Sequence, residues 1–284
     1  MLKFISFGSG SSGNCYYLFN GTFGILIDAG IGIRALKKHF RDCGLRFADA
    51  RCIIVTHDHA DHVKAVGRIS SELNVPVYAT RSVHEGIDHN YCVHKKIAPQ
   101  NKRLIEKGRE LRLVSEAGLD ADLCGEGDMW YCPMVMAFDV PHDSNDNVGY
   151  RIVWEGKTFC LMTDAGHVTD EMKRYIGEAE YLVIEANHDI EMLMKGSYPP
   201  YLKTRVSGER GHLSNNDCAV AIAENASPRL RRVWLCHLSH ENNHPELARK
   251  TVSMILGRYG IVVGRDFQVE PLKRNTPSEI YALE

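Results

Sequence analysis

Short apolar runs, most of them followed at once by a polar or glycine-containing turn, recur along the whole chain. Runs of this kind are typical of buried β-strands. The runs on either side of Asn20-Gly21 and of Glu155-Gly156-Lys157 should form hairpins, because these residues suit a tight turn. The predicted strands cover residues 2–7, 15–19, 22–27, 51–55, 77–79, 110–114, 129–140, 147–154, 158–163, 181–184, 232–236 and 268–270.

Segments with helical periodicity alternate with these strands. We predict helices over residues 32–43, 81–88, 215–226 and 245–259, and a further helix that turns Val63, Val66, Ile69 and Leu73 inward. This alternation indicates an α/β fold. The acidic stretch 116–128 is predicted to be a surface connection. No repeat, linker or low-complexity segment divides the chain, so we predict one domain over residues 1–284.

Composition narrows the class of protein. A hydrophobic fraction of 44% is ordinary for a globular chain, and a net charge of -2 provides no global attraction to nucleic acid. Glycines interrupt the first apolar stretch before a secretory signal could form, and no run approaches membrane-spanning length. Nine cysteines without a C-x-x-C pair predict free thiols, Cys236 among them in the core, and a reducing, cytoplasmic location.

Positive charge is gathered locally in two groups. We interpret the first as a solvated surface. The second is either a surface or part of a substrate site, because it leads toward His212. The first group is Lys95, Lys96, Lys102, Arg103, Lys107 and Arg109, and the second is Lys195, Lys203, Arg205 and Arg210.

The sequence THDHADHV, residues 56–63, is the strongest chemical signal. It follows a predicted buried strand, and open α/β sheets keep their sites at the carboxyl ends of strands. Imidazoles and a carboxylate suit zinc, manganese or iron. Adjacent side chains diverge, so four ligands on so short an arc predict two ions. His57 and His59 should serve one ion and Asp61 and His62 the other, while Asp58 should point away.

Other polar residues also stand just past predicted strands. The loop GSGSSGN, residues 8–14, is able to bring its backbone close to a ligand. Asp28 can orient an imidazole ligand. Ser214 and Asp217 form a capping-box pattern at a helix start that suits an anion, with His212 beside it. The remaining residues at strand ends are His142, Asp164, Glu185 and His237.

Strands that end in Asp28, the H-x-H-x-D-H cluster, His142, Asp164 and His237, in that order, resemble the five motifs of the metallo-β-lactamase superfamily. The resemblance implies a four-layer αββα sandwich, with two mixed β-sheets face to face, helices outside and the site at one edge. It implies two divalent metal ions, with Asp164 bridging them and Asp28 in support. The first ion would be held by His57, His59 and His142, and the second by Asp61, His62 and His237.

Further motifs indicate which branch of the superfamily the chain resembles. The segments around Glu185 and His212 resemble those of RNase Z-like phosphodiesterases, in which the histidine contacts phosphate. GSGSSGN, PHDSNDNVGY, TDAG, EANHD, GHLSN and HLSHENN resemble the YycJ/WalJ branch, bacterial proteins regarded as DNA exonuclease-like. The RNase Z segment G-H-S-T reads Gly-His-Leu-Ser here, and no long substrate-binding arm is apparent, which argues against transfer RNA as the substrate.

We therefore predict a two-metal phosphodiesterase that acts on nucleic acid, DNA rather than RNA, or on another phosphodiester. Asp61 can accept a hydrogen bond from the attacking water. His212, oriented by Glu185, would stabilise or protonate the departing oxygen. His188 is a second candidate for that role. His167, His240 and His244 are interpreted as surface or supporting residues.

Two rival functions remain open. The same site can hydrolyse a thioester, a lactone or a β-lactam, although such a hydrolase needs no phosphate-contacting His212. A catalytically silent metal-binding regulatory module is the other alternative, and missing ligands would indicate it. A redox di-iron site is disfavoured, because that branch has a glutamate where His59 stands. The sequence does not predict an oligomeric state.

Overall fold

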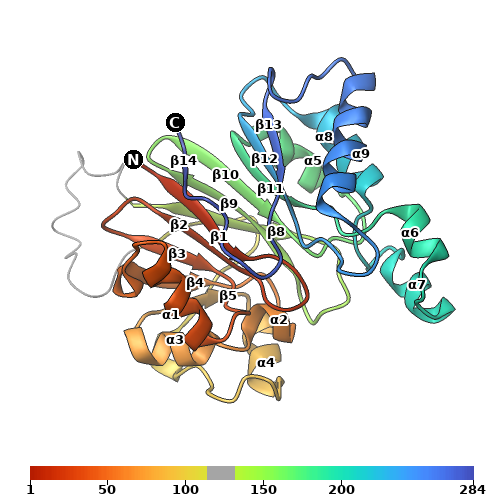
Figure 1. The fold of residues 1–284 in the computed structure, drawn as a ribbon. Coiled ribbons are helices and arrows are strands. Elements are labelled where there is room, and N and C mark those ends of the chain that lie inside the picture. The colour runs from red at the N-terminus through yellow and green to blue at the C-terminus, as the bar shows by residue number, and fades with distance from the viewer. Residues whose placement is uncertain (114–131) are drawn as a thin grey trace.

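The computed structural model describes residues 1–113 and 132–284. Two seven-stranded sheets pack face to face, and helices cover the outer faces of both (Figure 1). The predicted four-layer arrangement is confirmed. The predicted connection 116–128, Val114 and the first residues of the predicted strand 129–140 lie outside the described residues.

The first sheet has the order β14-β1-β2-β3-β4-β5-β6. Its first strands pair antiparallel, whereas β3 to β6 run parallel, as expected where helices connect the strands. The strands are β1 (Lys3–Gly8), β2 (Cys15–Phe19), β3 (Gly24–Ile27), β4 (Ala50–Ile54), β5 (Val77–Ala79), β6 (Lys102–Leu104) and β14 (Tyr281–Ala282), and the helices α1 (Ile33–Asp42), α2 (Ala60–Val63), α3 (Val66–Leu73) and α4 (Arg81–His89) belong to this half.

The second sheet has the order β13-β12-β11-β10-β9-β8-β7, and strands β10 to β13 run parallel. Helices α6 and α7 project from the body, while α5, α8 and α9 cover this sheet (Figure 1). The elements are β7 (Glu110–Arg112), β8 (Met134–Asp139), β9 (Val148–Trp154), β10 (Lys157–Met162), β11 (Tyr181–Glu185), β12 (Arg232–Cys236), β13 (Gln268–Pro271), α5 (Asp170–Glu178), α6 (Ile190–Lys195), α7 (Pro200–Val206), α8 (Asn215–Asn225) and α9 (Pro245–Arg258).

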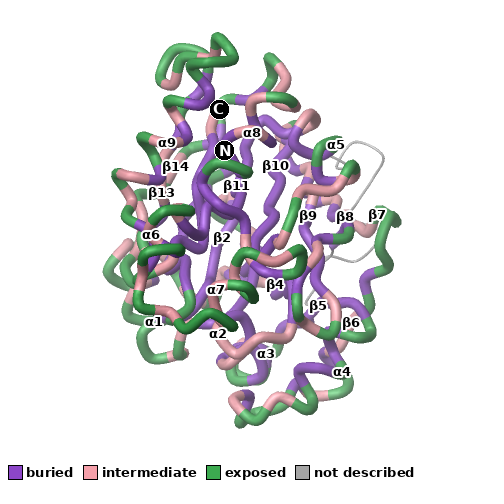
Figure 2. Tube along the Cα trace, turned by 90° about the vertical axis from the view of Figure 1, so that its right-hand side faces the viewer, coloured by how far each residue is buried: buried purple, intermediate pink, exposed green. Residues whose placement is uncertain are grey.

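Apolar side chains fill three layers, one between the sheets and one beneath the helices on each side. Figure 2 shows the strands as the buried centre and the outward faces of the helices as exposed. Between the sheets, the ring centroids of Phe4 and Trp234 lie 4.5 Å apart. The Tyr150 hydroxyl donates to the carbonyl oxygen of Val55 at 2.6 Å. These contacts join the facing surfaces of the two sheets.

The single helix predicted after residue 62 is wrong, because it is divided into α2 and α3. The backbone N–H of Ala65 donates to the carbonyl oxygen of Ala29 at 2.9 Å, and the N–H of Ala29 donates to the carbonyl oxygen of His62 at 2.6 Å. These long-range bonds divert the backbone between the helices. Val63, Val66 and Ile69 are nevertheless buried, as their spacing predicts.

Cys236 is a free thiol and lies in the core as predicted. Strands β6 and β14 and helices α5, α6 and α7 have no counterpart in the sequence prediction. None of the helices in residues 1–113 and 132–284 has the length and apolar character that crossing a membrane requires.

Candidate metal centre

The seven predicted metal ligands lie together at one edge of the sandwich. Parallel strands from both sheets end at this edge, so residues that follow them along the chain become neighbours in space. Ligand atoms lie within 4.8 Å of one another in each of three overlapping sets, which are His57, His59 and His142; Asp61, His62 and His237; and His57, His62 and Asp164. Asp164 therefore adjoins both of the predicted ion sites.

The first cluster consists of imidazoles, His57, His59 and His142. The ring centroids of His57 and His59 lie 4.7 Å apart, and those of His57 and His142 lie 5.2 Å apart. The Nδ1 of His142 donates to the carbonyl oxygen of Gly211 at 3.0 Å, because a carbonyl can only accept. This bond puts the lone pair of the neutral imidazole on Nε2, which lies 3.3 Å from Oδ1 of Asp143.

His57 supplies the test of whether this cluster fits a metal. Thr56 Oγ1 bonds to both oxygens of Asp28, so its only proton is taken, and Nδ1 of His57 at 3.0 Å must donate to it. The tautomer thus puts the lone pair of His57 on Nε2. This atom is buried and has no hydrogen-bond partner among the described residues. A buried, unpartnered acceptor among other imidazoles fits a divalent cation.

The second cluster, Asp61, His62 and His237, contains a carboxylate and lies beside two more. Nε2 of His62 lies 3.0 Å from Oδ2 of Asp164. Nε2 of His237 lies 3.4 Å from Oδ2 of Asp61. Nδ1 of His62 lies 2.7 Å from Oδ2 of Asp28, so the imidazole that Asp28 contacts is that of His62. A carboxylate on the far nitrogen of an imidazole raises its basicity as a metal ligand.

The pKa values of the imidazoles differ between the two clusters. Burial, reinforced by the neighbouring imidazoles, holds the pKa of His57 well below its ordinary value, and burial also lowers the pKa of His142. Burial opposes protonation of His62 as well, but the carboxylates of Asp164, Asp28 and Asp61 outweigh it and raise the pKa of His62 to about 10. Carboxylates raise the pKa of His237 well above its ordinary value in the same way.

Glu185 joins three separate segments at the centre. Its carboxylate is buried and accepts hydrogen bonds from the backbone N–H of Ala165 at 2.8 Å and of Leu213 at 3.2 Å. Nδ1 of His212 lies 2.8 Å from Oε1 of Glu185, and Nδ1 of His237 lies 3.0 Å from the same oxygen. Glu185 therefore orients both imidazoles, whereas the sequence assigned it only to His212.

His212 lies between the two clusters and is partly exposed. Its ring centroid lies 5.0 Å from that of His142 and 5.3 Å from that of His237, and 18% of its side chain is exposed to solvent. Burial opposes its protonation, but Glu185 and Asp164 outweigh burial and raise the pKa of His212. The paired Glu185 has its pKa lowered to about 2, because His212 and His237 outweigh burial. Nδ1 of His212 donates to the Glu185 carboxylate, and the raised pKa favours the charged form of this imidazole.

Three residues of the centre have left-handed backbone angles. Asp28, Asp164 and His237 have φ values of 62°, 52° and 52°. Each follows a strand closely, and the turn in the backbone aims the side chain across the edge of the sheets. Residues other than glycine rarely adopt these angles, and such strain concentrates at functional sites. No signal in the sequence indicated this conformation.

Several supporting residues were missed in the sequence. Nδ2 of Asn14 lies 2.8 Å from Nε2 of His62, and the backbone N–H of Asn14 donates to the carbonyl oxygen of Asp61 at 2.7 Å. Ser9 Oγ accepts from the backbone N–H of His237 at 2.9 Å. A Cβ on Gly30 would lie 1.6 Å from the carbonyl oxygen of Asp61, so only glycine fits there. The glycine content of residues 8–14 and 28–30 was the available signal for this close packing.

The predicted anion site at the start of α8 is wrong. Ser214 and Asp217 form the predicted cap, because Ser214 Oγ accepts from the N–H of Asp217 at 3.1 Å. The N–H of Asn215 donates to the carbonyl oxygen of His188 at 2.8 Å, and the N–H of Leu213 is taken by Glu185. These donors are satisfied internally and the Asp217 carboxylate lies at the positive end of the helix, so a phosphate would be repelled.

Other candidate residues lie away from the clustered atoms. His188 is buried, belongs to none of these sets, and its Nδ1 has no partner among the described residues. Asp58 accepts from Nδ2 of Asn145 at 2.8 Å and so points away, as expected. His240 is exposed and lies 3.2 Å from Glu241. His244 is the residue that precedes helix α9.

Most members of the two basic groups have polar partners on the protein. In the first group, Lys102 pairs with Asp88, and Lys107 pairs with Asp139 and Asp146. In the second, Lys195 pairs with Glu191, Arg205 pairs with Asp143, and Arg210 donates to the carbonyl oxygen of His142 at 2.8 Å. These contacts favour a structural role for the cations of both groups.

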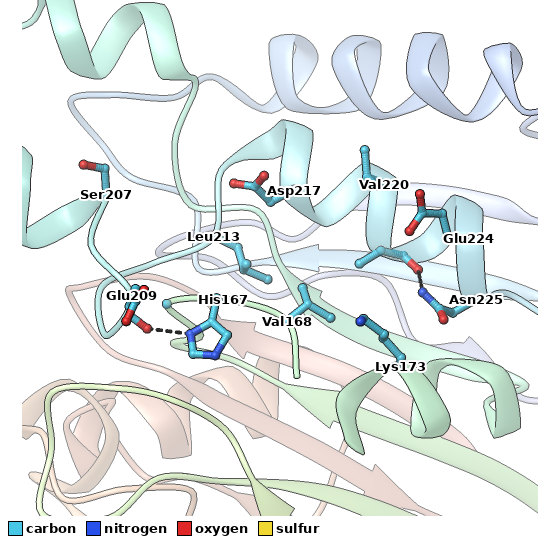
Figure 3. Close-up of a pocket in the computed structure, with 12 residues that line it drawn as sticks. His167, Val168, Lys173, Ser207, Glu209, Leu213, Asp217, Val220, Glu224 and Asn225 are labelled. Carbon is cyan, nitrogen blue, oxygen red and sulfur yellow. Dashed lines mark hydrogen bonds between the residues drawn. The ribbon is translucent and has the colours of Figure 1, made fainter. Parts of the chain in front are cut away.

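A pocket of about 420 Å³ opens near the centre, between α5, α8 and the segment that carries His167 (Figure 3). Its floor includes Leu213, which follows His212 in the chain. The His167 Nδ1 donates to the carbonyl oxygen of Glu209 at 2.8 Å. The lining also carries the carboxylates of Glu209, Asp217 and Glu224. These charges disfavour an anionic phosphate in this pocket.

Comparison with known proteins agrees with this geometry. A family model described as "Beta-lactamase superfamily domain" matches residues 24–238. The chain is 33% identical over 279 residues to "Exodeoxyribonuclease YycJ" of Bacillus anthracis, with 98% of each chain covered. It is 32% identical over 278 residues to "Exodeoxyribonuclease WalJ" of Streptococcus pneumoniae serotype 2, with 98% of this chain and 97% of that one covered.

The fold comparison points the same way. The metallo-β-lactamase fold protein YhfI of Bacillus subtilis superimposes with a TM-score of 0.66 at 15% identity, with 98% of each chain covered. The histidine and aspartate clusters at the edge of this fold bind divalent metal. With clusters, fold and full-length relatives in agreement, the chain belongs to the metallo-β-lactamase superfamily of metal-dependent hydrolases, in its YycJ/WalJ branch.

Proposed function

We propose that the chain is a two-metal phosphodiesterase that removes nucleotides from the end of a DNA strand. Its full-length relatives are named exodeoxyribonucleases, which supports a nucleic acid substrate and favours DNA over RNA. The predictions of zinc or manganese as the metals and of a cytoplasmic location belong to this proposal. Two ions are expected because the predicted ligands form two clusters, and Asp164 lies with one ligand of each, His57 and His62.

The observation that carries the proposal is the His212–Glu185 pair at the open side of the metal clusters. Nδ1 of His212 is bonded to Glu185 at 2.8 Å, and the ring lies beside His142 and His237, which belong to different clusters. A charged imidazolium held there has a proton to give to an oxygen that leaves between the clusters. Hydrolysis of a phosphodiester between sugars needs such a proton, because an alkoxide is a poor leaving group.

The predicted ligands would hold the cations in two sets. His57, His59 and His142 would hold the first, and Asp61, His62 and His237 the second, with Asp164 shared. Bound divalent cations lower the pKa of water to near 7 and stabilise the charge on a phosphate under attack. Asp61 is partly exposed, with 23% of its side chain accessible, so one oxygen can accept a hydrogen bond from the attacking water.

Two rivals are less well supported. A thioester, lactone or β-lactam hydrolase would not need a protonated His212 oriented by the buried Glu185. A catalytically silent metal-binding module is expected to lack ligands, and all seven predicted ligands lie within the clusters. His188 remains a secondary candidate only, because its side chain is buried and lies outside the ligand sets.

The test compares substrates whose leaving groups differ in basicity. The metal-loaded protein is assayed with end-labelled DNA and RNA, a p-nitrophenyl phosphodiester, a thioester and a β-lactam. His212→Ala should slow DNA cleavage by about 10²- to 10⁴-fold. It should slow the p-nitrophenyl diester much less, because p-nitrophenolate leaves without a proton.

Controls separate this role from general damage. Asp61→Ala combined with His62→Ala should abolish every hydrolysis by removing two predicted ligands. His240→Ala removes an exposed imidazole that belongs to none of the ligand sets and should leave all rates unchanged. Turnover of only the thioester or the β-lactam, or an equal loss on both diesters in His212→Ala, would contradict the proposal.

A further inference from the structure

The loop Gly8–Asn14 is tied to the metal centre but has no part in the chemistry above. Near its start, Ser9 Oγ accepts from the backbone N–H of His237 at 2.9 Å. At its end, Nδ2 of Asn14 lies 2.8 Å from Nε2 of His62. The loop is therefore held against the second cluster at both ends, which is more order than a simple connection between β1 and β2 requires.

The tip of this loop presents free hydrogen-bond donors. Ser11 and Ser12 are exposed, and the described residues include no acceptor for the backbone N–H of either one. Both residues also carry hydroxyl groups. Consecutive Cα atoms lie about 3.8 Å apart, so Ser12 is within about 8 Å of Asn14, which contacts the second cluster. The tip of the loop therefore lies near the second cluster.

Two cations flank the tip. Nζ of Lys64 donates to the carbonyl oxygen of Ser12 at 2.6 Å. The Arg274 side chain lies against the loop, since Cγ of Arg274 is 3.2 Å from a Cβ built on Gly10, and its Nη1 donates to the carbonyl oxygen of Ser239 at 2.7 Å. Each cation keeps further N–H groups for another acceptor.

These cations differ from others around the site in having no counter-ion. Within residues 1–113 and 132–284, neither Lys64 nor Arg274 forms an ion pair, whereas Arg205 and Lys107 are bound to carboxylates. Unpaired positive charge beside free backbone donors favours an anion. The arrangement therefore has the chemistry of a phosphate site.

The carboxyl-terminal segment is hydrogen-bonded to the loop and to β1. The backbone N–H of Ser9 donates to the carbonyl oxygen of Arg274 at 3.1 Å, and the N–H of Ser278 donates to the carbonyl oxygen of Ser6 at 2.8 Å. Figure 1 shows this segment passing in front of β1 on its way to β14. These bonds hold the backbone of Arg274 beside the loop.

We propose that Ser11, Ser12, Lys64 and Arg274 form a subsite for the terminal phosphate of the nucleic acid strand, one nucleotide from the metal centre. The inference rests on the proposed function and deepens it, because a bound terminal phosphate would make the enzyme act from strand ends. Positive charge and backbone N–H groups bind the two charges of a phosphate monoester better than the single charge of an internal diester.

The test measures binding and hydrolysis separately. Single-stranded oligodeoxynucleotides carry a 5′-phosphate, a 3′-phosphate or no terminal phosphate, with phosphorothioate linkages to slow cleavage and an internal fluorophore. Fluorescence anisotropy with the metal-loaded protein should give tighter binding, by about 10- to 100-fold, for one of the phosphorylated ends. Lys64→Gln combined with Arg274→Gln should abolish that preference, while keeping donors for the carbonyl oxygens of Ser12 and Ser239.

A charge-matched control is Arg249→Gln with Lys250→Gln, which removes two exposed cations from α9. It should keep the preference for the phosphorylated end. The Lys64 and Arg274 double variant should hydrolyse a p-nitrophenyl phosphodiester at the wild-type rate, since this substrate has no second phosphate. Circular dichroism and the two single variants exclude misfolding as the cause of a lost preference.

Two outcomes would overturn the subsite. One is equal affinity of the wild type for all three oligonucleotides, and the other is an end preference that survives in the double variant. A parallel loss of p-nitrophenyl diester hydrolysis would assign the two cations a structural role instead. If the wild type prefers a phosphorylated end but hydrolyses no diester, the proposed function fails while the subsite stands.

Discussion

The two metal clusters sit side by side but are built from different chemistry. The first cluster is supported by neutral groups, the hydroxyl of Thr56 behind His57 and the carbonyl oxygen of Gly211 behind His142. The second cluster is supported by carboxylates, with Asp28 behind His62 and Glu185 behind His237. Burial lowers the pKa of His57 and His142 in the first cluster, whereas carboxylates raise the pKa of His62 and His237 in the second.

Because of this difference, we expect the two clusters to bind divalent cations with different dependence on pH. A cation entering the first cluster meets free lone pairs. A cation entering the second must displace the protons that Asp164 and its neighbours hold on His62 and His237. Once bound, it gains the stronger attraction of the carboxylates. We expect the first cluster to fill first at mildly acidic pH.

The largest effect is expected from removing Asp164, the carboxylate that adjoins both clusters. Asp164→Ala takes a carboxylate oxygen from both, so both ions should be lost and diester hydrolysis should fall by about 10³-fold or more. Metal content by mass spectrometry and initial rates measure the result. Asp170→Ala, at an exposed carboxylate on α5, is the control. Retention of both ions with nearly normal rates would refute the bridging role.

A smaller effect is expected from Gly30→Ala, which should disturb metal binding at the second cluster only. In Gly30→Ala the new Cβ would lie 1.6 Å from the carbonyl oxygen of Asp61 and 2.7 Å from the backbone nitrogen of Asn14, so the backbone must shift. We expect metal content to fall toward one ion per chain and the midpoint of thermal unfolding to drop by several degrees. Gly32→Ala has nothing within 4 Å of its Cβ and should change neither.

Asp28→Asn tests the carboxylate that supports His62 in the second cluster. Nδ1 of His62 would lose its carboxylate partner, and loss of such a partner typically weakens metal binding by about 10- to 100-fold. Competition with a chelator should locate the loss in the second cluster. Asp58→Asn alters a carboxylate in the same segment that faces Asn145, and it should leave metal affinity unchanged. Equal losses in both variants would contradict the specific role of Asp28.

The smallest effect is in proton release. Raised pKa values mean that His62 and His237 hold protons below those pKa values, so the apparent affinity of the second cluster should rise with pH across the neutral range. Titration calorimetry in buffers of different ionisation enthalpy should give about one proton or more released per ion in His59→Ala, which leaves the second cluster intact. Asp61→Ala, which leaves the first cluster, should release almost none. Greater proton release in Asp61→Ala than in His59→Ala would contradict the proposed difference between the two clusters.

Much of the fold and of the centre could be predicted from the sequence because the signals were local. Apolar runs bounded by turns identified most of the strands, and four candidate ligands within residues 57–62 required no tertiary information to suggest a metal site. The order of Asp28, His142, Asp164 and His237 along the chain added the superfamily and hence the partners of that cluster. What these residues share is their position just past a strand, a pattern that sequence retains.

Tertiary structure alone decided which groups surround each ligand. Glu185 serves His237 as well as His212 because β11 and β12 lie side by side, and Asn14 reaches His62 because the loop after β1 folds over the second cluster. The helix start that resembled an anion site is occupied by its own cap and by Glu185, whereas Lys64 and Arg274, far apart in sequence, meet at one loop unpaired. The ion-pair and hydrogen-bond partners of a residue depend on contacts between distant segments, and the local periodicity of the sequence does not predict these contacts.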